Sequence, residues 1–461
     1  KTKENFDRDI KLDLSNQDKE YEQKMFPVNI VFDSNALMKW QFGYMMHYSG
    51  QNEAVKLLED FQREVITTII SYKLPVITLS KETPREAVCK VFENVNTGGV
   101  PLTVFELVTA TYATREFNLR DDWKVCKKQI RGIDDTLRTD LLDGIDETTF
   151  LTAVALYTSY VDKQAGKIGA VSCKKKDVLN LTFESYVANR DQVLLGFRIA
   201  RDFLLKYQYV FRQRDLPYTT QLIPLAAICA FLGKSKCNEA NTIAILSRWY
   251  WCGILGEMYG GANETRYAND IEDVVDEVLQ RPSQSRTVNS AFFSATRLLT
   301  LRTRLSAAYK GIMALLYKAK CRDFMNDTTI DIVNSMLEAP DIHHIFPEAY
   351  CEKMGIKQQR YNSIVNKTPI LPATNRSIGG NAPSEYIKII LKKVNNLTEE
   401  ELKARIESHC INYDALAADD FDTYFIDRAK KLLNLIESAM GKPVADRSAE
   451  ITIEQFGASL A

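Results

Sequence analysis

The sequence predicts a mainly α protein with small α+β parts, and three observations support this. Helical 3.6-residue periodicity runs almost without interruption through residues 123–337. Short β-like runs occur near the start and after Pro340. A chain of 461 residues suggests two to four domains. We therefore expect an N-terminal α+β domain at 1–115, a helical domain at 116–330 and a C-terminal domain at 331–461 that ends in helix.

Composition excludes several classes of protein. The chain is 45% hydrophobic and 26% charged, which is typical of soluble globular proteins and not of disordered ones. Its longest apolar runs are too short to span a bilayer, and no signal-peptide pattern opens the chain. The nine cysteines are scattered without a C-x-x-C pair, as in reduced cytosolic proteins. We expect a cytoplasmic protein, and the missing opening Met suggests that an N-terminal part has been removed.

The N-terminal elements follow from periodicity and capping residues. Phe26–Asp33 and Leu74–Ser80 are rich in β-branched residues, so each is predicted to form a strand. Asn52–Lys73 has helical periodicity. Thr83–Asn96 opens with a Thr cap, a Pro and an acid three residues after the cap, which predicts a helix. The glycine pair Gly98–Gly99 is expected to end it in a left-handed turn.

The stretch after Pro340 has a different pattern. "DIHHIFP" (341–347) is a short β-like run closed by proline, and a polar loop follows it. "KTPILP" (367–372) is a second short apolar run, after which the helical pattern returns. The predicted order is strand, loop, strand, helix.

His343 and His344 stand side by side in a chain with four histidines. Neighbouring residues of a strand face opposite ways, so the two rings are expected to have different environments and different roles. Hydrolysis of a phosphodiester needs a base for the attacking water and a cation that stabilises the developing charge. His344 as the base, with His343 and an oxygen of Asn375 on Mg²⁺, would supply both. Asn366 would hold the intervening loop through side-chain-to-backbone hydrogen bonds.

Charge is distributed unevenly along the chain, although the formal net charge is only −1. Residues 295–325 hold seven Lys or Arg against Asp323 alone, a balance of 7 − 1 = +6. Residues 341–395 hold eight Lys or Arg against four acids, a balance of 8 − 4 = +4. One such run is usually a solvated helix face, but two runs that bracket the histidine pair favour a polyanionic partner.

The stretch "DIHHIFP…NSIVNKTPILPATNRSIGGNAPSEY" resembles the HNH, or ββα-metal, nuclease motif. It looks especially like the HNH domain of CRISPR effector nucleases, where an acid precedes the base His and two Asn stand nine residues apart, as Asn366 and Asn375 do (375 − 366). Most of the chain is similar to the GmrSD family of modification-dependent, type IV restriction and phage-defence proteins. "VFENVNTGGVPLTVFEL" resembles the end of that family's ParB/sulfiredoxin-like nucleotide-binding domain. "WYWCGILGEMYGGANETRYANDI" and "RLLTLRTRLSAAYKGIMALL" resemble its helical middle.

The resemblance implies a role for each residue of the C-terminal motif. His344 corresponds to the general base, and Asn366 to the structural Asn of the catalytic group. His343 and Asn375 correspond to metal ligands. Asp341 is grouped with the metal site as an orienter of the His343 ring.

The resemblance also implies cofactors and partners. The expected metal is Mg²⁺ or Mn²⁺, and the expected partner is double-stranded DNA, modified or not. Arg376, Lys367 and Lys388 are the expected DNA contacts. The family's Asp-Gly-Gln-Gln-Arg motif is missing here, so an NTP as second cofactor stays open, as does a homo-oligomer.

Three readings of function follow. The first is a metal-dependent DNA endonuclease of anti-phage defence that nicks or cleaves DNA at the HNH site, regulated by NTP if a nucleotide site is present. The alternative is a nucleotide- or DNA-binding sensor whose nuclease domain is silent. A structural zinc at the histidine pair is the third, and the lack of paired thiols disfavours it.

Overall fold

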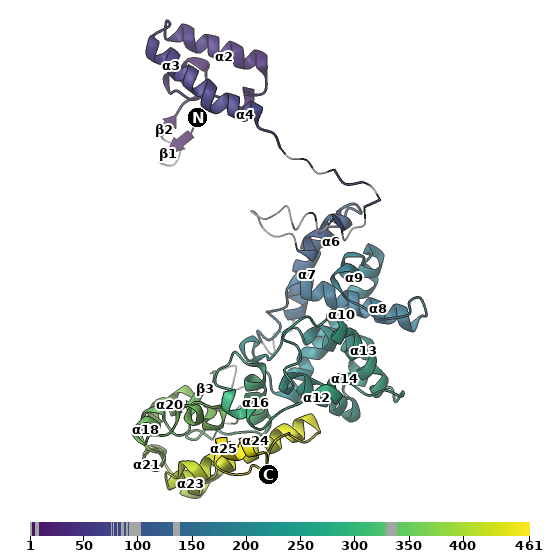
Figure 1. The fold of residues 1–461 in the computed structure, drawn as a ribbon, viewed down its shortest axis with the longest axis vertical. Helices are drawn as coiled ribbons and strands as arrows, with labels where there is room; N and C mark the ends of the chain where they lie inside the picture. Colours follow the sequence, from purple (N-terminus) through teal and green to yellow (C-terminus); the bar gives the residue numbers. More distant parts are fainter. Residues whose placement is uncertain are drawn as a thin grey trace. The chain divides into compact units, whose positions relative to one another are not determined.

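The computed structural model describes residues 2–4, 9–74, 76, 78–80, 82–83, 87–88, 91, 103–131, 139–327, 329 and 339–461. The chain folds into two compact units, Lys1–Thr83 and Pro84–Ala461 (Figure 1). Both are mainly helical, as the sequence predicts. Among the described residues, no helix combines the length and the apolar character needed to cross a bilayer.

The N-terminal unit is small and built largely from short helices. Its elements are β1 (Thr2–Glu4), β2 (Asp9–Leu12), α1 (Gln17–Glu22), the 3₁₀ turn η1 (Val28–Ile30), α2 (Ser34–His47), α3 (Asn52–Phe61), the π-turn η2 (Gln62–Ile66) and α4 (Thr67–Ser71). β1 and β2 pair antiparallel. The helix predicted over Asn52–Lys73 is confirmed by α3, η2 and α4.

The two strands predicted in the N-terminal unit do not form among the residues that the structure describes, so both predictions are wrong there. Phe26–Asp33 forms η1 and a turn into α2, where the Asp33 side chain accepts hydrogen bonds from the N–H groups of Asn35 and Ala36. This cap and Pro27, which has no N–H, override the β-propensity of the segment. The described residues of Leu74–Ser80 form no strand, and Leu74 lies exposed. Residues 92–102, with the predicted Gly98–Gly99 turn, lie outside the described ranges.

The first part of the second unit is a stack of helices. It contains α6 (Val104–Ala113), α7 (Leu119–Arg131), α8 (Glu147–Gln164), α9 (Lys175–Leu179), α10 (Phe183–Phe203), the π-turn η4 (Leu204–Gln208), η5 (Gln213–Asp215), α11 (Leu222–Cys237), α12 (Ala240–Leu255), α13 (Glu264–Val278), α14 (Arg286–Ser290), α15 (Arg297–Thr300) and α16 (Ala307–Lys318). α10 and α11 pack closely because Gly196 has no side chain: a Cβ there would lie 2.2 Å from the Ala226 carbonyl oxygen.

The C-terminal part has the two predicted strands and the helix after them, but the stretch predicted as a polar loop between the strands contains two short helices and a 3₁₀ turn. It contains β3 (Asp341–His344), α18 (Glu348–Lys353), α19 (Gln358–Tyr361), η6 (Ile364–Asn366), β4 (Lys367–Ile370), α20 (Pro372–Ile378), α21 (Pro383–Lys393), α22 (Glu399–Glu407), α23 (Tyr413–Ala417), α24 (Phe421–Met440) and α25 (Glu450–Phe456). β3 and β4 pair antiparallel, and α20 begins two residues after β4 ends.

The structure divides into compact units at Thr83, while the predicted boundaries at residues 115 and 330 stay predictions. Residue 330 lies outside the described ranges. The helices on either side of it share one hydrophobic core, which extends from α6 to α25. The Ala295 N–H donates to the Ala445 carbonyl at 3.0 Å, and the Ala445 N–H donates to the Phe293 carbonyl at 2.9 Å. The helical stack and the C-terminal part are therefore one packed body.

Candidate active site

The paired strands β3 and β4 give the two histidines different surroundings. His343 lies opposite Thr368 and His344 lies opposite Lys367. The His343 side chain is 4% exposed, while His344 is half-buried and Asp341 is exposed. This alternation confirms the expectation that neighbouring strand residues would face different environments.

The His343 ring faces the side chain of Asn375. Its Nδ1 lies 2.9 Å from Asn375 Oδ1, and the Asn375 Nδ2 group donates to Asp341 Oδ2 at 3.5 Å. Burial lowers the pKa of His343 to about 3, although the bond to Asn375 opposes that shift. The ring is therefore neutral at physiological pH, which is the form that binds metal ions.

The donors of this cluster fit a hard divalent cation. Neighbouring ligands of an octahedral Mg²⁺, each about 2.1 Å from the metal, lie about 3.0 Å apart. The separation of 2.9 Å between His343 Nδ1 and Asn375 Oδ1 matches that spacing. Because an amide oxygen only accepts, His343 Nδ1 carries the ring proton in the hydrogen bond to Asn375; metal binding at Nδ1 would move that proton to Nε2, which has no acceptor among the described residues. Asp341 adds a carboxylate beside the amide.

No group of three or more His, Cys, Asp or Glu side chains that could hold a metal ion occurs in the part of the chain that the structure describes. The cluster instead combines one imidazole, one amide oxygen and one carboxylate. Oxygen ligands of this kind are typical of magnesium and manganese sites.

One ring nitrogen of His344 has no hydrogen-bond partner among the residues that the structure describes. Its Nε2 lies 3.3 Å from Asn362 Oδ1, and since an amide oxygen only accepts hydrogen bonds, the proton belongs on Nε2. Nδ1 is then the unprotonated nitrogen. Burial and the ammonium of Lys367 lower the pKa of His344, against smaller opposing effects of Asn362 and Glu348. The ring is thus held in the neutral form that a general base requires.

Asn366 holds the loop between the strands. It is fully buried, and its Nδ2 group donates to the carbonyls of Phe346 and Tyr361 at 2.8 and 2.9 Å. Its Oδ1 accepts from the Phe346 N–H at 2.9 Å and from the Tyr424 hydroxyl at 3.3 Å. The expected side-chain-to-backbone bonds are present, and they place Asn366 as a support and not as a group that touches substrate.

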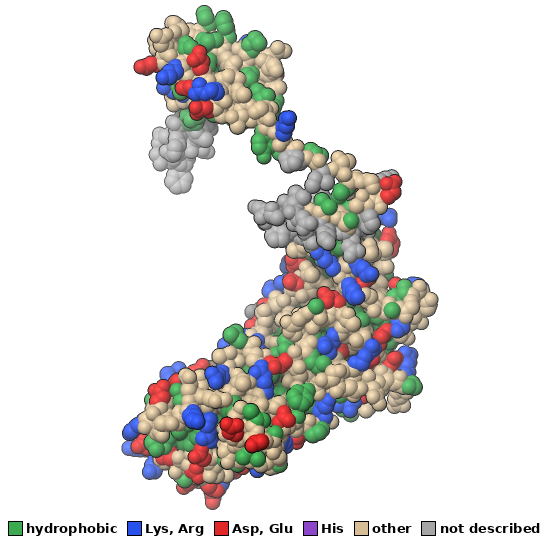
Figure 2. Space-filling view, in the orientation of Figure 1, with side chains coloured by type: hydrophobic (Ala, Val, Ile, Leu, Met, Phe, Trp, Pro, Cys, Tyr) green, Lys and Arg blue, Asp and Glu red, His purple; other side chains and the backbone are tan. Residues whose placement is uncertain are grey.

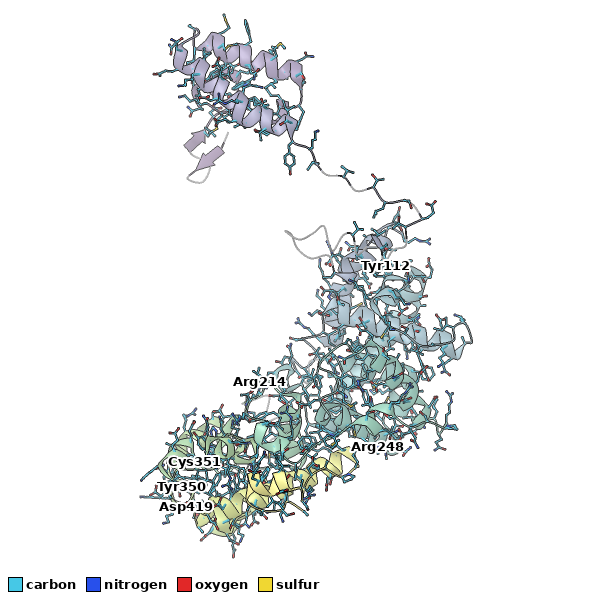
Figure 3. All side chains as sticks on the ribbon, in the orientation of Figure 1. Tyr112, Arg214, Arg248, Tyr350, Cys351 and Asp419 are labelled. Carbon is cyan, nitrogen blue, oxygen red and sulfur yellow. The ribbon has the colours of Figure 1, made fainter. Side chains whose placement is uncertain are left out.

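Neighbouring helices anchor the same loop. The Cys351 thiol on α18, labelled in Figure 3, donates to the Phe346 carbonyl at 3.5 Å. The guanidinium of Arg428 on α24 donates to the carbonyls of Val365 and Lys367, the latter at 2.9 Å. The Tyr386 hydroxyl on α21 donates to the Ile345 carbonyl at 3.0 Å. The backbone beside both histidines is therefore fixed from three helices.

The three predicted DNA contacts have different positions. Arg376 on α20 and Lys388 on α21 are exposed and have no ion pair or hydrogen bond with any described residue. Lys367 is 6% exposed, and its ammonium donates to the Arg302 carbonyl at 2.6 Å. Burial lowers the pKa of Lys367 to about 8. The structure therefore does not place Lys367 on a surface that faces DNA, because strand register directs it inward opposite His344.

Two positioning residues were missed in the sequence. Asn362 orients the His344 ring, and a lone Asn in a polar loop carries no signal of that contact. Asp323 is fully buried; its carboxylate accepts from the Leu371 N–H at 2.9 Å and from the Thr374 hydroxyl at 2.7 Å. It thereby fixes the start of α20, the helix that carries Asn375. Its signal was visible: it is the one acid among seven cations in residues 295–325.

Comparisons with known proteins relate the chain to restriction enzymes. Residues 1–113 match the family model described as the N-terminal domain of the GmrSD restriction endonuclease. An uncharacterized protein of Methanocaldococcus jannaschii is 24% identical over 447 residues, which cover 89% of this chain and 70% of that protein. The N-terminal part of the predicted family resemblance is thus supported. The match points to a restriction or defence nuclease, and it does not extend to the histidine pair.

Proposed function

We propose that the chain is a metal-dependent endonuclease that hydrolyses DNA phosphodiester bonds at the His343–His344 site in defence against phage. The observation that carries the proposal is the separation of the two rings. One is buried against an amide oxygen at 2.9 Å, and the other is half-buried, with one ring nitrogen that has no hydrogen-bond partner among the described residues. The two paired strands and the helix after them support an HNH assignment.

Each residue has a distinct part in the proposed reaction. His344 Nδ1 takes the proton of the attacking water, and Asn362 keeps its Nε2 protonated. His343 and Asn375, with Asp341 beside them, would hold Mg²⁺ or Mn²⁺. The bound cation supplies stabilisation of the charge that develops on the phosphate and on the leaving oxygen. Asn366 holds the loop between the two strands through its side-chain bonds to Phe346 and Tyr361.

DNA as the substrate is supported by the exposed cations around the site and by the match to a restriction endonuclease domain. Arg376 and Lys388 are exposed on the two helices that follow β4, and each is proposed to contact a phosphate of the DNA backbone. Dependence on a DNA modification, regulation by NTP and a cytoplasmic location stay predictions.

Supercoiled plasmid incubated with Mg²⁺ or Mn²⁺ tests the proposal. The wild-type chain should give nicked or linear plasmid, and His344→Ala should slow this about 10²–10⁴-fold, the usual contribution of a general base. His47→Ala is the control, since it removes a histidine that is exposed on the N-terminal unit. Melting temperatures of both variants should stay close to that of the wild type. A band shift without nicking by the wild-type chain would favour the silent-nuclease alternative instead.

A further inference from the structure

Helix α2 is apolar on two opposite faces. Leu37, Trp40 and Tyr44 are buried within the N-terminal unit. On the other side Met38, Phe42 and Met46 are 68%, 61% and 64% exposed. Successive residues of an α-helix are 100° apart, so the centres of these two sets lie nearly opposite each other.

This second face departs from that of an ordinary surface helix. A helix that covers one core normally carries charged residues on its outer face, and one that is apolar all round is normally buried. Lys39 is the one Lys, Arg, Asp or Glu in α2. The described core of the unit consists of two clusters with three fully buried members each. Figure 2 shows hydrophobic side chains gathered on the surface of this unit. A unit this small buries little apolar surface by itself, so covering this face would add to its free energy of unfolding.

The spacing of the exposed side chains fits a copy of the same helix. Met38, Phe42 and Met46 are each four residues apart and form one i, i+4 ridge. Packing such ridges between two helices gives the commonest crossing in globular proteins. Met38 and Met46 lie four residues before and four residues after Phe42, so the ridge is symmetric about Phe42. A two-fold axis at Phe42 therefore sets each Met38 against the Met46 of the second copy, as a closed, self-complementary interface requires.

The exposed apolar area of this face is close to the apolar area that one partner buries in a standard homodimer interface. With side chains of roughly 200 Å² each, Met38, Phe42, Met45 and Met46 expose about 450 Å² of apolar surface per copy. A standard interface buries about 800 Å² per partner, and homodimer interfaces are about 65% apolar, or about 500 Å². We propose that two copies of the chain associate through α2, with Phe42 on the two-fold axis.

Sedimentation velocity of the full chain over a range of micromolar concentrations tests this inference. The wild-type chain should sediment as a dimer, and Phe42→Glu as a monomer, because two buried carboxylates would meet on the axis. Phe292→Glu is the matched control, since Phe292 is 62% exposed in the other unit; it should remain dimeric. A monomeric wild type, or a dimer that survives Phe42→Glu, would overturn the proposal.

Cross-linking distinguishes a second copy from a segment of the same chain. A short bis-maleimide should link Phe42→Cys to itself between copies, and Met38→Cys to Met46→Cys in a mixture of the two variants. If Phe42→Glu instead lowers the melting temperature of a chain that is always monomeric, the same chain covers the face and the dimer is wrong. Nuclease activity is not a readout here, so the outcome is independent of the proposed function.

Discussion

The two basic runs look alike in the sequence but differ in the structure. In residues 295–325, five of the seven cations have a partner, while Arg302 and Lys320 are exposed with no side-chain partner among the described residues. Arg297 pairs with Glu257 at 2.8 Å, Lys310 donates to the Leu216 carbonyl at 3.0 Å, and Arg322 pairs with Asp327 at 2.8 Å. In residues 341–395, six cations are exposed without a partner among the described residues: Lys353, Lys357, Arg376, Lys388, Lys392 and Lys393. Figure 2 shows Lys and Arg interleaved with acids over the C-terminal part.

Residues of the 295–325 run accept hydrogen bonds that hold groups of the C-terminal part in place. The Arg302 carbonyl accepts from Lys367, and the Asp323 carboxylate accepts from two groups at the start of α20. The Arg322 carbonyl accepts from His409 Nε2 at 2.7 Å. A count of charges in the sequence therefore cannot distinguish a DNA-binding surface from residues that hold the fold together. The difference depends on whether each side chain has a partner within the protein.

The largest expected effect is on DNA binding. Replacing Arg376, Lys388, Lys392 and Lys393 together by Ala should lower the slope of log K against log salt by about 3 to 4, at about 0.9 per lost phosphate contact. Affinity at low salt should fall on the order of a hundredfold or more. Fluorescence anisotropy with a labelled duplex at several salt concentrations measures both.

The first run supplies the control for that experiment. Replacing Arg297 and Arg322 by Ala should leave the salt slope unchanged, since neither cation is free. An equal loss of slope in both variants would show that the two runs do not differ in the way described.

The second prediction concerns stability. Asp323→Ala leaves the N–H of Leu371 and the hydroxyl of Thr374 without their buried acceptor, along with two further N–H groups at Met325 and Asn326. The free energy of unfolding should fall by about 3 kcal/mol. Asp327→Ala, which removes partly exposed pairs with Arg322 and Arg405, should cost less, about 1 kcal/mol. Urea unfolding measures both, and equal losses would contradict the supporting role of Asp323.

The third prediction concerns pH. Burial lowers the pKa of His409 to about 3, while its Nε2 donates to the Arg322 carbonyl and its Nδ1 accepts from the Thr368 hydroxyl. The unfolded chain takes up a proton at this residue below about pH 6.5 and the folded chain does not. Stability from His409 is therefore complete above pH 6.5 and falls by about 1.4 kcal/mol per pH unit below it. Urea unfolding at pH 7.5 and 5.5 should show a smaller acid loss in His409→Gln, and an unchanged loss would be inconsistent with this bridge.

The smallest expected effect is that of Arg297→Ala. Its pair with Glu257 is about one-third exposed, so the free energy of unfolding should fall by about 1 kcal/mol or less. A shift of the thermal midpoint by a few degrees at most is the measurable result. A larger loss would mean that the side-chain cations of residues 295–325 contribute more to the free energy of unfolding than the Arg302 and Arg322 carbonyls and the Asp323 carboxylate do.

The sequence predicted those features that depend on local pattern. The order around β3 and β4 follows from short apolar runs closed by prolines, and the different environments of His343 and His344 follow from the two-residue period of a strand. Contacts between distant residues carried no local signal. Asp323 reaches Leu371 and Thr374 across about 50 residues of chain, and Asn362 reaches His344 across the loop. Phe26–Asp33 failed because its capping contact into α2 outweighed its β-propensity.

The central claim is that His344 acts as the base while Asn375 and Asp341 belong to the metal site. Mn²⁺ binding followed by electron paramagnetic resonance tests it directly, in the wild-type chain, His344→Ala, Asn375→Ala and Asp341→Ala. We predict that His344→Ala binds Mn²⁺ as the wild type does but does not cut plasmid. Asn375→Ala should bind it about 10–100-fold more weakly, with a smaller loss in Asp341→Ala. Equal weakening in His344→Ala and Asn375→Ala, or wild-type Mn²⁺ affinity in Asn375→Ala, would contradict the account.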